Sequence, residues 1–304
     1  MKNATRSLRE KYQKEFAKIF FSMTGKHSPW EIWQDFIYLA AIEISNVVDL
    51  DNKPERTKTY QMLMKKYTEA DQKAFAELFN AVVMGMERSQ NHDFLGELYM
   101  MLNLGNAKAG QFFTPYDLCA AMARVSSGNL KSQIEEQHWV SVYDPACGAG
   151  ATLLAFAEEC MCLGINYQTS VLFVAQDVDY VVGLMCYIQL SLRGCPGYVV
   201  IANTLTTPEI CVDQRGLIPI HGDNVWYTPF YFRQEWHFRR LWAQMDMLFR
   251  PITPQKGERE SLQAASETGD NPTPTRGKRR VKAATAPPMK ESMNETKTGQ
   301  LTLF

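Results

Sequence analysis

The stretch Asp144-Pro145-Ala146-Cys147-Gly148-Ala149-Gly150 decides how this sequence is interpreted. It follows the strand-like run Trp139–Tyr143 and precedes a helical segment rich in small residues, Ala151–Leu163. A turn between a strand and a helix needs glycine where a ligand approaches the backbone closely, and the helix that follows presents free N–H groups to that ligand. The glycines match neither G-x-G-x-x-G nor G-x-x-x-x-G-K-[ST], which disfavours a dinucleotide site and excludes a P-loop.

The same alternation of strand and helix continues along the chain. Val171–Ala175 and Tyr198–Ala202 are apolar runs typical of buried strands, and Val181–Leu192 between them has a helical pattern. Three strands separated by helices predict an α/β domain with a parallel sheet. Ligands bind outside the carboxyl ends of the strands in such sheets. Beyond the third strand we expect a short strand near Leu217–Ile220 and an amphipathic helix over Arg233–Leu248.

Residues 1–109 predict an all-α N-terminal domain. Ser28-Pro29-Trp30-Glu31 has the residue types of a helix start, with Ser as N-cap, Pro at the first helical position and Glu three residues after the cap. Aromatic and aliphatic side chains recur at helical spacing in the segments Ser7–Met23, Trp30–Ile44, Pro54–Tyr67, Thr68–Glu87 and Phe94–Leu104. Gly105 is the expected C-cap of the last of them.

Composition bounds the class of protein. The chain has 304 residues, of which 45% are hydrophobic and 21% charged, enough apolar material for a sizeable core. This balance excludes collagen-like, disulfide-scaffold and wholly disordered proteins. The first ten residues lack the apolar region of a signal peptide, and the most apolar stretch, Phe36–Val48, is too short to span a bilayer and contains Glu43. We therefore expect no membrane partner.

The cysteines predict a reducing compartment. There are seven, an odd number, scattered along a chain without an export signal, which is typical of reduced thiols in a cytoplasm. Cys160 and Cys162 form a lone C-x-C without a second pair of ligands, so we expect helix packing and no metal site.

The charge is unevenly distributed. Of the 32 Lys and Arg and 33 Asp and Glu, 9 and 6 lie in residues 251–304, which leaves 23 and 27 in residues 1–250. The folded part is therefore mildly acidic, and any affinity for DNA must come from local patches or from the tail. Residues 251–304 also hold 6 of the 14 prolines and a single aromatic residue, and they predict a disordered tail.

D-P-A-C-G-A-G resembles the S-adenosylmethionine-binding motif of DNA adenine-N6 methyltransferases, above all that of the modification subunits of type I restriction systems. Three further segments resemble the family's motifs in the same order: Gly110-Gln111-Phe112-Phe113-Thr114-Pro115, Gln176-Asp177-Val178-Asp179 and Asn203-Thr204-Leu205. The resemblance implies a short class I S-adenosylmethionine-dependent methyltransferase domain, Rossmann-like, over residues 110–250. It also implies DNA as a partner, together with a second methyltransferase or specificity subunit, and a bacterial cytoplasmic location. An origin in a mobile element, such as a phage, plasmid or conjugative element, would suit a chain this short.

The resemblance implies a place for each part of the cofactor. The segment before the first strand would cover the methionine end through Gln111, Phe112, Phe113, Thr114 and Pro115. The first loop would supply Asp144, Pro145, Ala146, Gly148 and Gly150. Asp177, with its neighbour Val178, would bind the ribose hydroxyls, because a carboxylate accepts two hydrogen bonds at once. Asp177 is chosen over Asp179 because it comes directly at the end of the strand. The third loop would face the adenine with Asn203, Thr204 and Leu205.

One motif of the family is missing. Adenine-N6 methyltransferases carry [NDS]-P-P-[YFW] after the fourth strand, where it accepts the hydrogens of the adenine amine and stacks on the flipped base. This sequence has no such tetrapeptide, and Tyr227-Thr228-Pro229-Phe230 is a distant echo of it. We assign no catalytic residue. Two hypotheses stay open: a methyltransferase with a divergent or partner-supplied loop, and a cofactor-binding or regulatory module that has lost catalysis. An unrelated nicotinamide or nucleotide enzyme is disfavoured.

The last five residues, Gln300-Leu301-Thr302-Leu303-Phe304, resemble the peptide Q-L-[SD]-L-F that binds the bacterial sliding clamp. Leu301, Leu303 and Phe304 would fill an apolar groove and Gln300 would bond at its edge; the alternative is a chance terminal pentapeptide. Two basic features could contact DNA phosphates. One is the run 276–282, equally consistent with a solvated charge run, and the other is the helix with Arg233, Arg239 and Arg240, for which a surface helix is the simpler interpretation.

Overall fold

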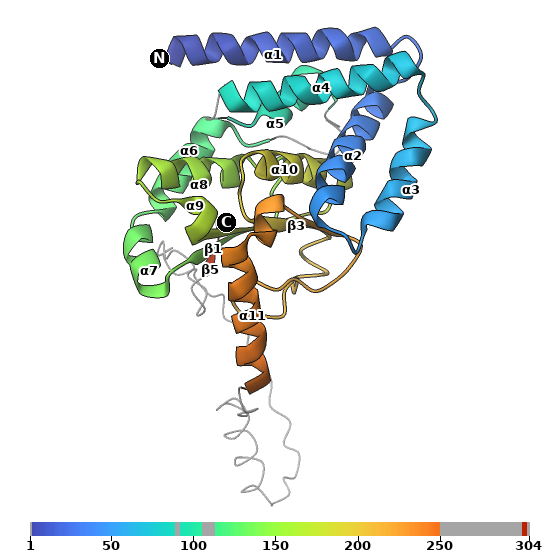
Figure 1. Cartoon of the computed structure of the whole chain (residues 1–304). Coiled ribbons are helices and arrows are strands. Elements are labelled where there is room, and N and C mark those ends of the chain that lie inside the picture. Colours follow the sequence, from blue (N-terminus) through green and yellow to red (C-terminus); the bar gives the residue numbers. More distant parts are fainter. Residues whose placement is uncertain (1, 89–91, 105–112, 250–299, 303–304) are drawn as a thin grey trace, which may run out of the picture. The chain divides into compact units, whose positions relative to one another are not determined.

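The computed structural model describes residues 2–88, 92–104, 113–249 and 300–302 (Figure 1). Residues 1–240 and 294–304 form one compact unit, and residues 241–293 form a second. The boundary predicted at residue 110 lies inside the first unit, and the buried core runs continuously from the N-terminal helices to the sheet.

The N-terminal region is helical, as the sequence predicts. The Ser28 side chain accepts a hydrogen bond from the Glu31 N–H at 3.1 Å, which is the predicted helix start. Phe16 packs edge-on against Trp33 and Phe36, and all three side chains are at most 2% exposed. Gly105, the expected C-cap, lies outside the described residues. The helices are α1 (Lys2–Met23), α2 (Pro29–Val48), α3 (Lys53–Met64), α4 (Glu69–Arg88) and α5 (Phe94–Met101).

A parallel sheet follows, as the sequence predicts. Its strands β1 (Val140–Asp144), β2 (Val171–Asp177) and β3 (Gly197–Ile201) run side by side in parallel. The crossover helices are α8 (Ala151–Cys162) and α10 (Tyr180–Leu192), and the N-terminal helices α2, α4 and α5 pack against α10 (Figure 1). The predicted fold class, a short Rossmann-like α/β domain preceded by helices, is confirmed.

The sheet has two further strands, and its order is β4-β3-β2-β1-β5. β4 (Val225–Tyr227) lies antiparallel to β3, whereas β5 (Gln300–Thr302) lies parallel to β1. The strand expected near Leu217–Ile220 does not form. In its place the structure has a single bridge, between Cys211 and Pro219, and the helix expected at Arg233 forms as α11 (Gln234–Phe249).

Several short elements were not predicted from the sequence. They are α6 (Tyr116–Ser126), α7 (Leu130–Gln137), the four-residue helix α9 (Tyr167–Ser170) and the 3₁₀ helix η2 (Pro229–Phe232). In α6 the buried residues are Cys119 and Ala123, two small side chains four positions apart that were not proposed as core from the sequence. β5 is also a departure, because the sequence predicts a disordered tail over residues 251–304.

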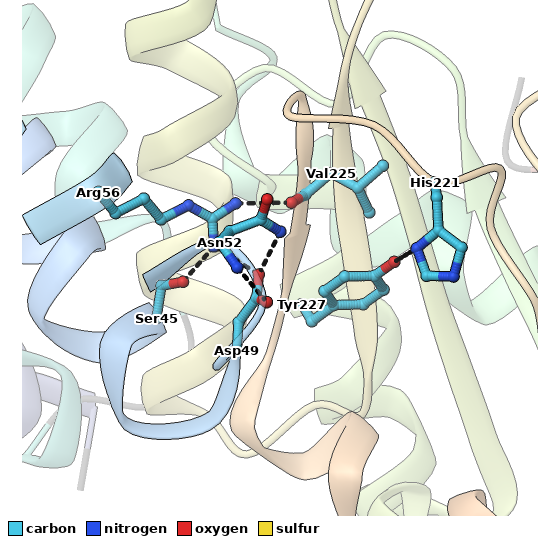
Figure 2. Close-up of polar contacts among 7 residues, drawn as sticks. All are labelled: Ser45, Asp49, Asn52, Arg56, His221, Val225 and Tyr227. Carbon is cyan, nitrogen blue, oxygen red and sulfur yellow. Dashed lines mark hydrogen bonds and ion pairs between the residues drawn. The ribbon is translucent and has the colours of Figure 1, made fainter. Parts of the chain in front are cut away.

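Arg56 of α3 ties the helical region to the sheet (Figure 2). Its guanidinium donates to Oδ2 of Asp49 at 2.6 Å, to the Val225 carbonyl of β4 at 2.8 Å, and to the Ser45 hydroxyl. The same group lies over the Trp226 ring, with Cζ 3.9 Å from the ring centroid. Arg56 and Asp49 form a buried ion pair whose side chains are 8% and 4% exposed.

All seven cysteines are free thiols, as expected. The described residues hold no cluster of His, Cys, Asp and Glu suited to a metal ion. Among these residues, no helix combines the length and the apolar character that a membrane crossing requires.

Candidate cofactor-binding site

A cavity opens at the carboxyl end of β1. It brings together two segments that the sequence analysis singled out separately: the loop that follows β1, and Phe113-Thr114 from the segment before α6. Its lining also includes residues that the sequence analysis did not propose. The full set is Asp93, Phe113, Thr114, Asp144, Ala146, Cys147, Gly148, Ala149, Ala151 and Thr152.

The loop needs its glycines. Gly148 and Gly150 have φ angles of +55° and +95°, in the left-handed region that side chains disfavour. A Cβ on Gly148 would come within 3.3 Å of the Phe113 ring, and one on Gly150 would lie 2.8 Å from Sγ of Cys186. Glycine therefore allows the loop to turn tightly against α10 and lets the Phe113 ring approach the loop backbone.

Asp144 is the last residue of β1, and its carboxylate holds this loop through two hydrogen bonds. One carboxylate oxygen accepts the Ala146 N–H at 3.1 Å, and the other accepts the Thr152 hydroxyl from the first turn of α8. The residue is fully buried. Burial raises the pKa of Asp144 to about 6, and the negative charge of Asp177 adds to the rise. Asp144 thus holds the loop closed while placing a carboxylate at the cavity.

Hydrogen bonds connect the three loops at the carboxyl ends of β1, β2 and β3. The Asp177 carboxylate accepts the Gly148 N–H at 2.9 Å, and the Thr204 hydroxyl donates to the Pro145 carbonyl. Burial raises the pKa of Asp177. The buried Gln176 side chain donates to the carbonyls of Ala202 and Thr207 at 3.3 and 3.0 Å. The three loops that carry these motifs therefore lie together at one end of the sheet.

The structure separates the two acids after β2. Asp179 is the N-cap of α10, where its carboxylate accepts the N–H groups of Val181 and Val182. Asp177 instead accepts the Gly148 N–H of the β1 loop. Neither acid lines the cavity.

Among the described residues, the other predicted site residues lie outside the cavity lining. The Asn203 side chain is exposed and accepts the Leu205 N–H of its own loop at 2.9 Å, while Val178 and Leu205 are 68% and 91% exposed. Thr204 donates a hydrogen bond to the Pro145 carbonyl, and Gly150 supplies the positive φ angle of the turn. Pro115 caps α6. Gln111 and Phe112 lie outside the described residues.

Asp93, which was not predicted from the sequence as a site residue, lines the cavity from the N-cap position of α5. Oδ1 of Asp93 accepts the Gly96 N–H at 2.8 Å and Nε2 of Gln189 at 2.6 Å. Gln189, on α10, also donates to the Ala149 carbonyl of the glycine loop at 2.8 Å. Burial raises the pKa of Asp93 to about 6. A Cβ on Gly96 would lie 1.9 Å from the Asp93 carboxylate, so the signal was Asp93 followed by glycine three residues later.

Tyr227-Thr228-Pro229-Phe230 does not contribute to this cavity. β4 runs antiparallel to β3, and Tyr227 pairs with Tyr198 near the amino end of β3. This tetrapeptide therefore lies at the end of the sheet opposite to Asp144. Thr228 bonds the start of β3, donating to the Cys195 carbonyl at 2.7 Å and accepting the Gly197 N–H at 3.0 Å. Its role is structural, and the tetrapeptide does not replace the missing motif.

The arginines at the start of α11 fix that helix to aromatic rings. Arg239 lies over Trp236, with Cζ 4.4 Å from the ring centroid, and donates to the Thr169 carbonyl at 2.6 Å. Arg240 lies 4.0 Å from the centroid of Tyr231 and donates to its carbonyl. These contacts support the simpler interpretation, a structural basic-aromatic helix.

A glycine loop after the first strand of a parallel sheet, held by a buried carboxylate at the strand end, is typical of a Rossmann-like cofactor-binding protein. Residues 90–260 match the model of the N-6 DNA Methylase family. This is more than half of the chain, which therefore belongs to that family. The matched range includes Asp93, which lies before the boundary predicted at residue 110.

One relative matches part of this chain. The chain is 30% identical over 121 residues to the type I restriction enzyme MpnII methylase subunit of Mycoplasma pneumoniae, a match of 39% of this chain and 20% of that protein. It thus spans a fifth of that relative's length.

Two solved structures are also similar. One is a putative class I S-adenosylmethionine-dependent methyltransferase from Listeria monocytogenes (16% identity, 73% of this chain and 56% of that chain, TM-score 0.36). The other is the type I restriction-modification methyltransferase subunit from Streptococcus thermophilus (12% identity, 66% and 59%, TM-score 0.32). The assignment depends on the family match.

S-adenosylmethionine is the cofactor of this family, and the cavity residues fit it. The glycine positions form a cradle in which a Cβ at Gly148 would meet the Phe113 ring. Two buried carboxylates, Asp93 and Asp144, face a cavity, which suits a ligand with cationic groups.

Proposed function

We propose that this protein binds S-adenosylmethionine in the cavity at the end of β1 and acts on or with DNA. One observation carries the proposal: the D-P-A-C-G-A-G loop and Phe113-Thr114, about 30 residues apart in sequence, line a single cavity. The cofactor, when bound, supplies an activated methyl group. Asp93 and Asp144 give the cavity two carboxylates for the ammonium and sulfonium groups of the cofactor. Asp177 does not line the cavity but bonds its loop at Gly148, and we assign it the ribose hydroxyls of a cofactor that extends beyond the cavity.

Methyl transfer is a separate step with its own requirements. The exocyclic amine of adenine is a poor nucleophile, and acceptors for its hydrogens must orient it toward the methyl group. Residues 1–304 contain no [NDS]-P-P-[YFW], and their nearest echo, at Tyr227, lies at the opposite end of the sheet. We therefore expect methyl transfer to need a loop from outside these residues, supplied by a second methyltransferase or specificity subunit.

The second candidate function is a non-catalytic module that the replication sliding clamp recruits to DNA. The terminal Gln300-Leu301-Thr302-Leu303-Phe304 favours it, because four of five positions match the clamp-binding pattern. Clamp association that is unchanged by deletion of residues 300–304 would contradict this function.

Asp144→Ala is expected to weaken the binding of S-adenosylmethionine. The substitution removes the acceptor of the Ala146 N–H and the Thr152 hydroxyl, so the loop loses the bonds that shape it. We expect an affinity loss of at least about ten-fold, the value of one charge-assisted hydrogen bond. Calorimetric titration with S-adenosylmethionine measures it. Asp51→Ala, an exposed acid between α2 and α3, is the matched control.

One result would refute the proposed cofactor site, and another would contradict the expected need for a loop from outside these residues. Absence of cofactor binding by the wild-type protein would refute the cavity assignment. Incorporation of labelled methyl groups into adenine by the isolated chain would show that residues 1–304 hold a catalytic loop that we have not recognised.

Cofactor affinity is expected to fall as the pH drops through about 6. Burial raises the pKa of Asp93 and Asp144 to about 6, so both carboxyls are ionised above that pH and become protonated below it. A cationic ligand prefers the ionised form. Affinity is therefore highest above pH 6 and decreases by up to about ten-fold per pH unit for each group below it. Titrations between about pH 8 and about pH 5 test this, and a constant affinity would contradict it.

A further inference from the structure

The outer edge of β1 is a place where this sheet accepts an extended segment. Residues 140–227 supply β1 to β4, and in that set β1 would be an edge strand. An edge strand leaves a row of N–H and C=O groups unpaired, and proteins protect such edges with charges, bulges or covering segments. Val140, Ser141 and Val142 carry no charge, and with β5 in place they are at most 1% exposed. The edge of β1 therefore has no charged side chain at these positions to protect it, and a covering segment is the remaining means of protection.

The chain's own C-terminal residues occupy this edge. β5 lies parallel to β1, with Gln300 opposite Ser141, Leu301 opposite Val142 and Thr302 opposite Tyr143. This is strand addition, in which main-chain hydrogen bonds join an extended segment to a sheet edge. The β5 pairing ends at Tyr143, directly before Asp144 of the cofactor cavity.

The segment on this edge is also the clamp-like peptide. Gln300 and Leu301 belong both to β5 and to the residues that the sequence analysis assigns to clamp binding. One stretch of backbone cannot pair with β1 and lie in a groove of another protein at the same time. A three-residue strand is shorter than the usual five or six, so it makes few main-chain bonds and a partner can displace it.

We propose that residues 300–302 exchange between the edge of β1 and the sliding clamp, so that docking on the sheet withholds the peptide from the clamp. This inference depends on the clamp-recruitment function proposed above. The two positions are mutually exclusive, and the affinity of the full chain for the clamp is reduced by the fraction of molecules in which β5 is docked. The edge of β1 is the intramolecular competitor.

Two variants separate docking from clamp binding. Thr302→Pro removes an N–H from β5 and places proline in a strand, which opposes pairing with β1. It keeps Gln300, Leu301, Leu303 and Phe304, the four positions assigned to the clamp. The combined variant Leu303→Ala with Phe304→Ala leaves residues 300–302 intact and removes two of the side chains expected to fill the clamp groove.

Hydrogen–deuterium exchange of β1 and titration with purified bacterial sliding clamp are measured on the full chain. For Thr302→Pro we expect exchange of the β1 amides that face β5 to rise at least about ten-fold and clamp affinity to rise at least about two-fold. A pentapeptide with the same substitution corrects for any direct effect on the groove. For Leu303→Ala with Phe304→Ala we expect unchanged β1 exchange and loss of clamp binding.

Each failure points to a different step. Unchanged β1 exchange in Thr302→Pro would overturn docking on the sheet. Increased exchange with unchanged clamp affinity would overturn the competition. Absence of clamp binding by the wild-type chain, by Thr302→Pro and by the free peptide would refute the clamp function and with it the switch. Loss of β1 protection on dilution would show that β5 comes from a second copy, which overturns the intramolecular form.

Discussion

Arg56→Met is expected to lower the free energy of unfolding by about 3–5 kcal/mol, the cost of removing one partner from a buried ion pair. The substitution preserves much of the side-chain volume. It leaves the Asp49 carboxylate, 4% exposed, without its cation, and it removes the donor to the Val225 carbonyl and the contact with the Trp226 ring. Because these groups join α2 and α3 to β4, the loss affects the junction of helices and sheet. Urea denaturation followed by circular dichroism measures it.

The matched control is Arg88→Met, which removes an exposed arginine at the end of α4. We expect it to change stability by no more than about 0.5 kcal/mol. The double variant Arg56→Met with Asp49→Asn should lose less than the two single losses combined, since no uncompensated charge stays buried. Equal losses for Arg56→Met and Arg88→Met would mean that the network of Figure 2 does not hold the junction.

The part of the fold that the sequence predicted is encoded locally. The two apolar runs became β2 and β3, because uninterrupted apolar runs suit strands buried on both faces. The strand-like run Trp139–Tyr143 became β1. The cap at Ser28 formed because its three signals lie within four residues. The glycine loop was predictable for the same reason, since positive φ angles at Gly148 and Gly150 require that residue type.

The part that the sequence did not predict depends on contacts between distant residues. The direction of β4 cannot be read from Val225–Tyr227, yet it places Tyr227 at the end of the sheet away from the cavity. β5 depends on pairing with a strand more than 150 residues earlier, and nothing in its composition indicates that partner. Asp93 has the local pattern of a helix cap. Only the contact between Asp93 and Gln189 shows that it reaches the cofactor loop.

Burying two carboxylates at this site lowers the stability of the ligand-free protein, and a bound cationic ligand can offset that loss. Asp93 and Asp144 lie at the same cavity, and burial raises the pKa of each to about 6. Above that pH the folded protein without ligand holds two ionised groups that would be better solvated in the unfolded chain. Asparagine or threonine could make the same loop bonds without this cost. The charge of Asp93 and Asp144 is therefore better explained by a cationic ligand than by the needs of the fold.

Asp93→Asn tests this explanation because its two expected effects have opposite signs. The amide oxygen keeps accepting from Gly96 and Gln189, while the charge is removed. A pKa raised in the folded state means that stability is greatest below the unfolded pKa and is lost as the pH rises through about 6. At pH 7 the variant should therefore be more stable, by at most on the order of 3 kcal/mol. Its affinity for S-adenosylmethionine should fall by about 10- to 150-fold, the worth of a charged hydrogen bond. Thermal denaturation and calorimetry on one preparation measure both, with Asp71→Asn, a buried helix-start acid away from the cavity, as control. Unchanged affinity would show that Asp93 is only a helix cap.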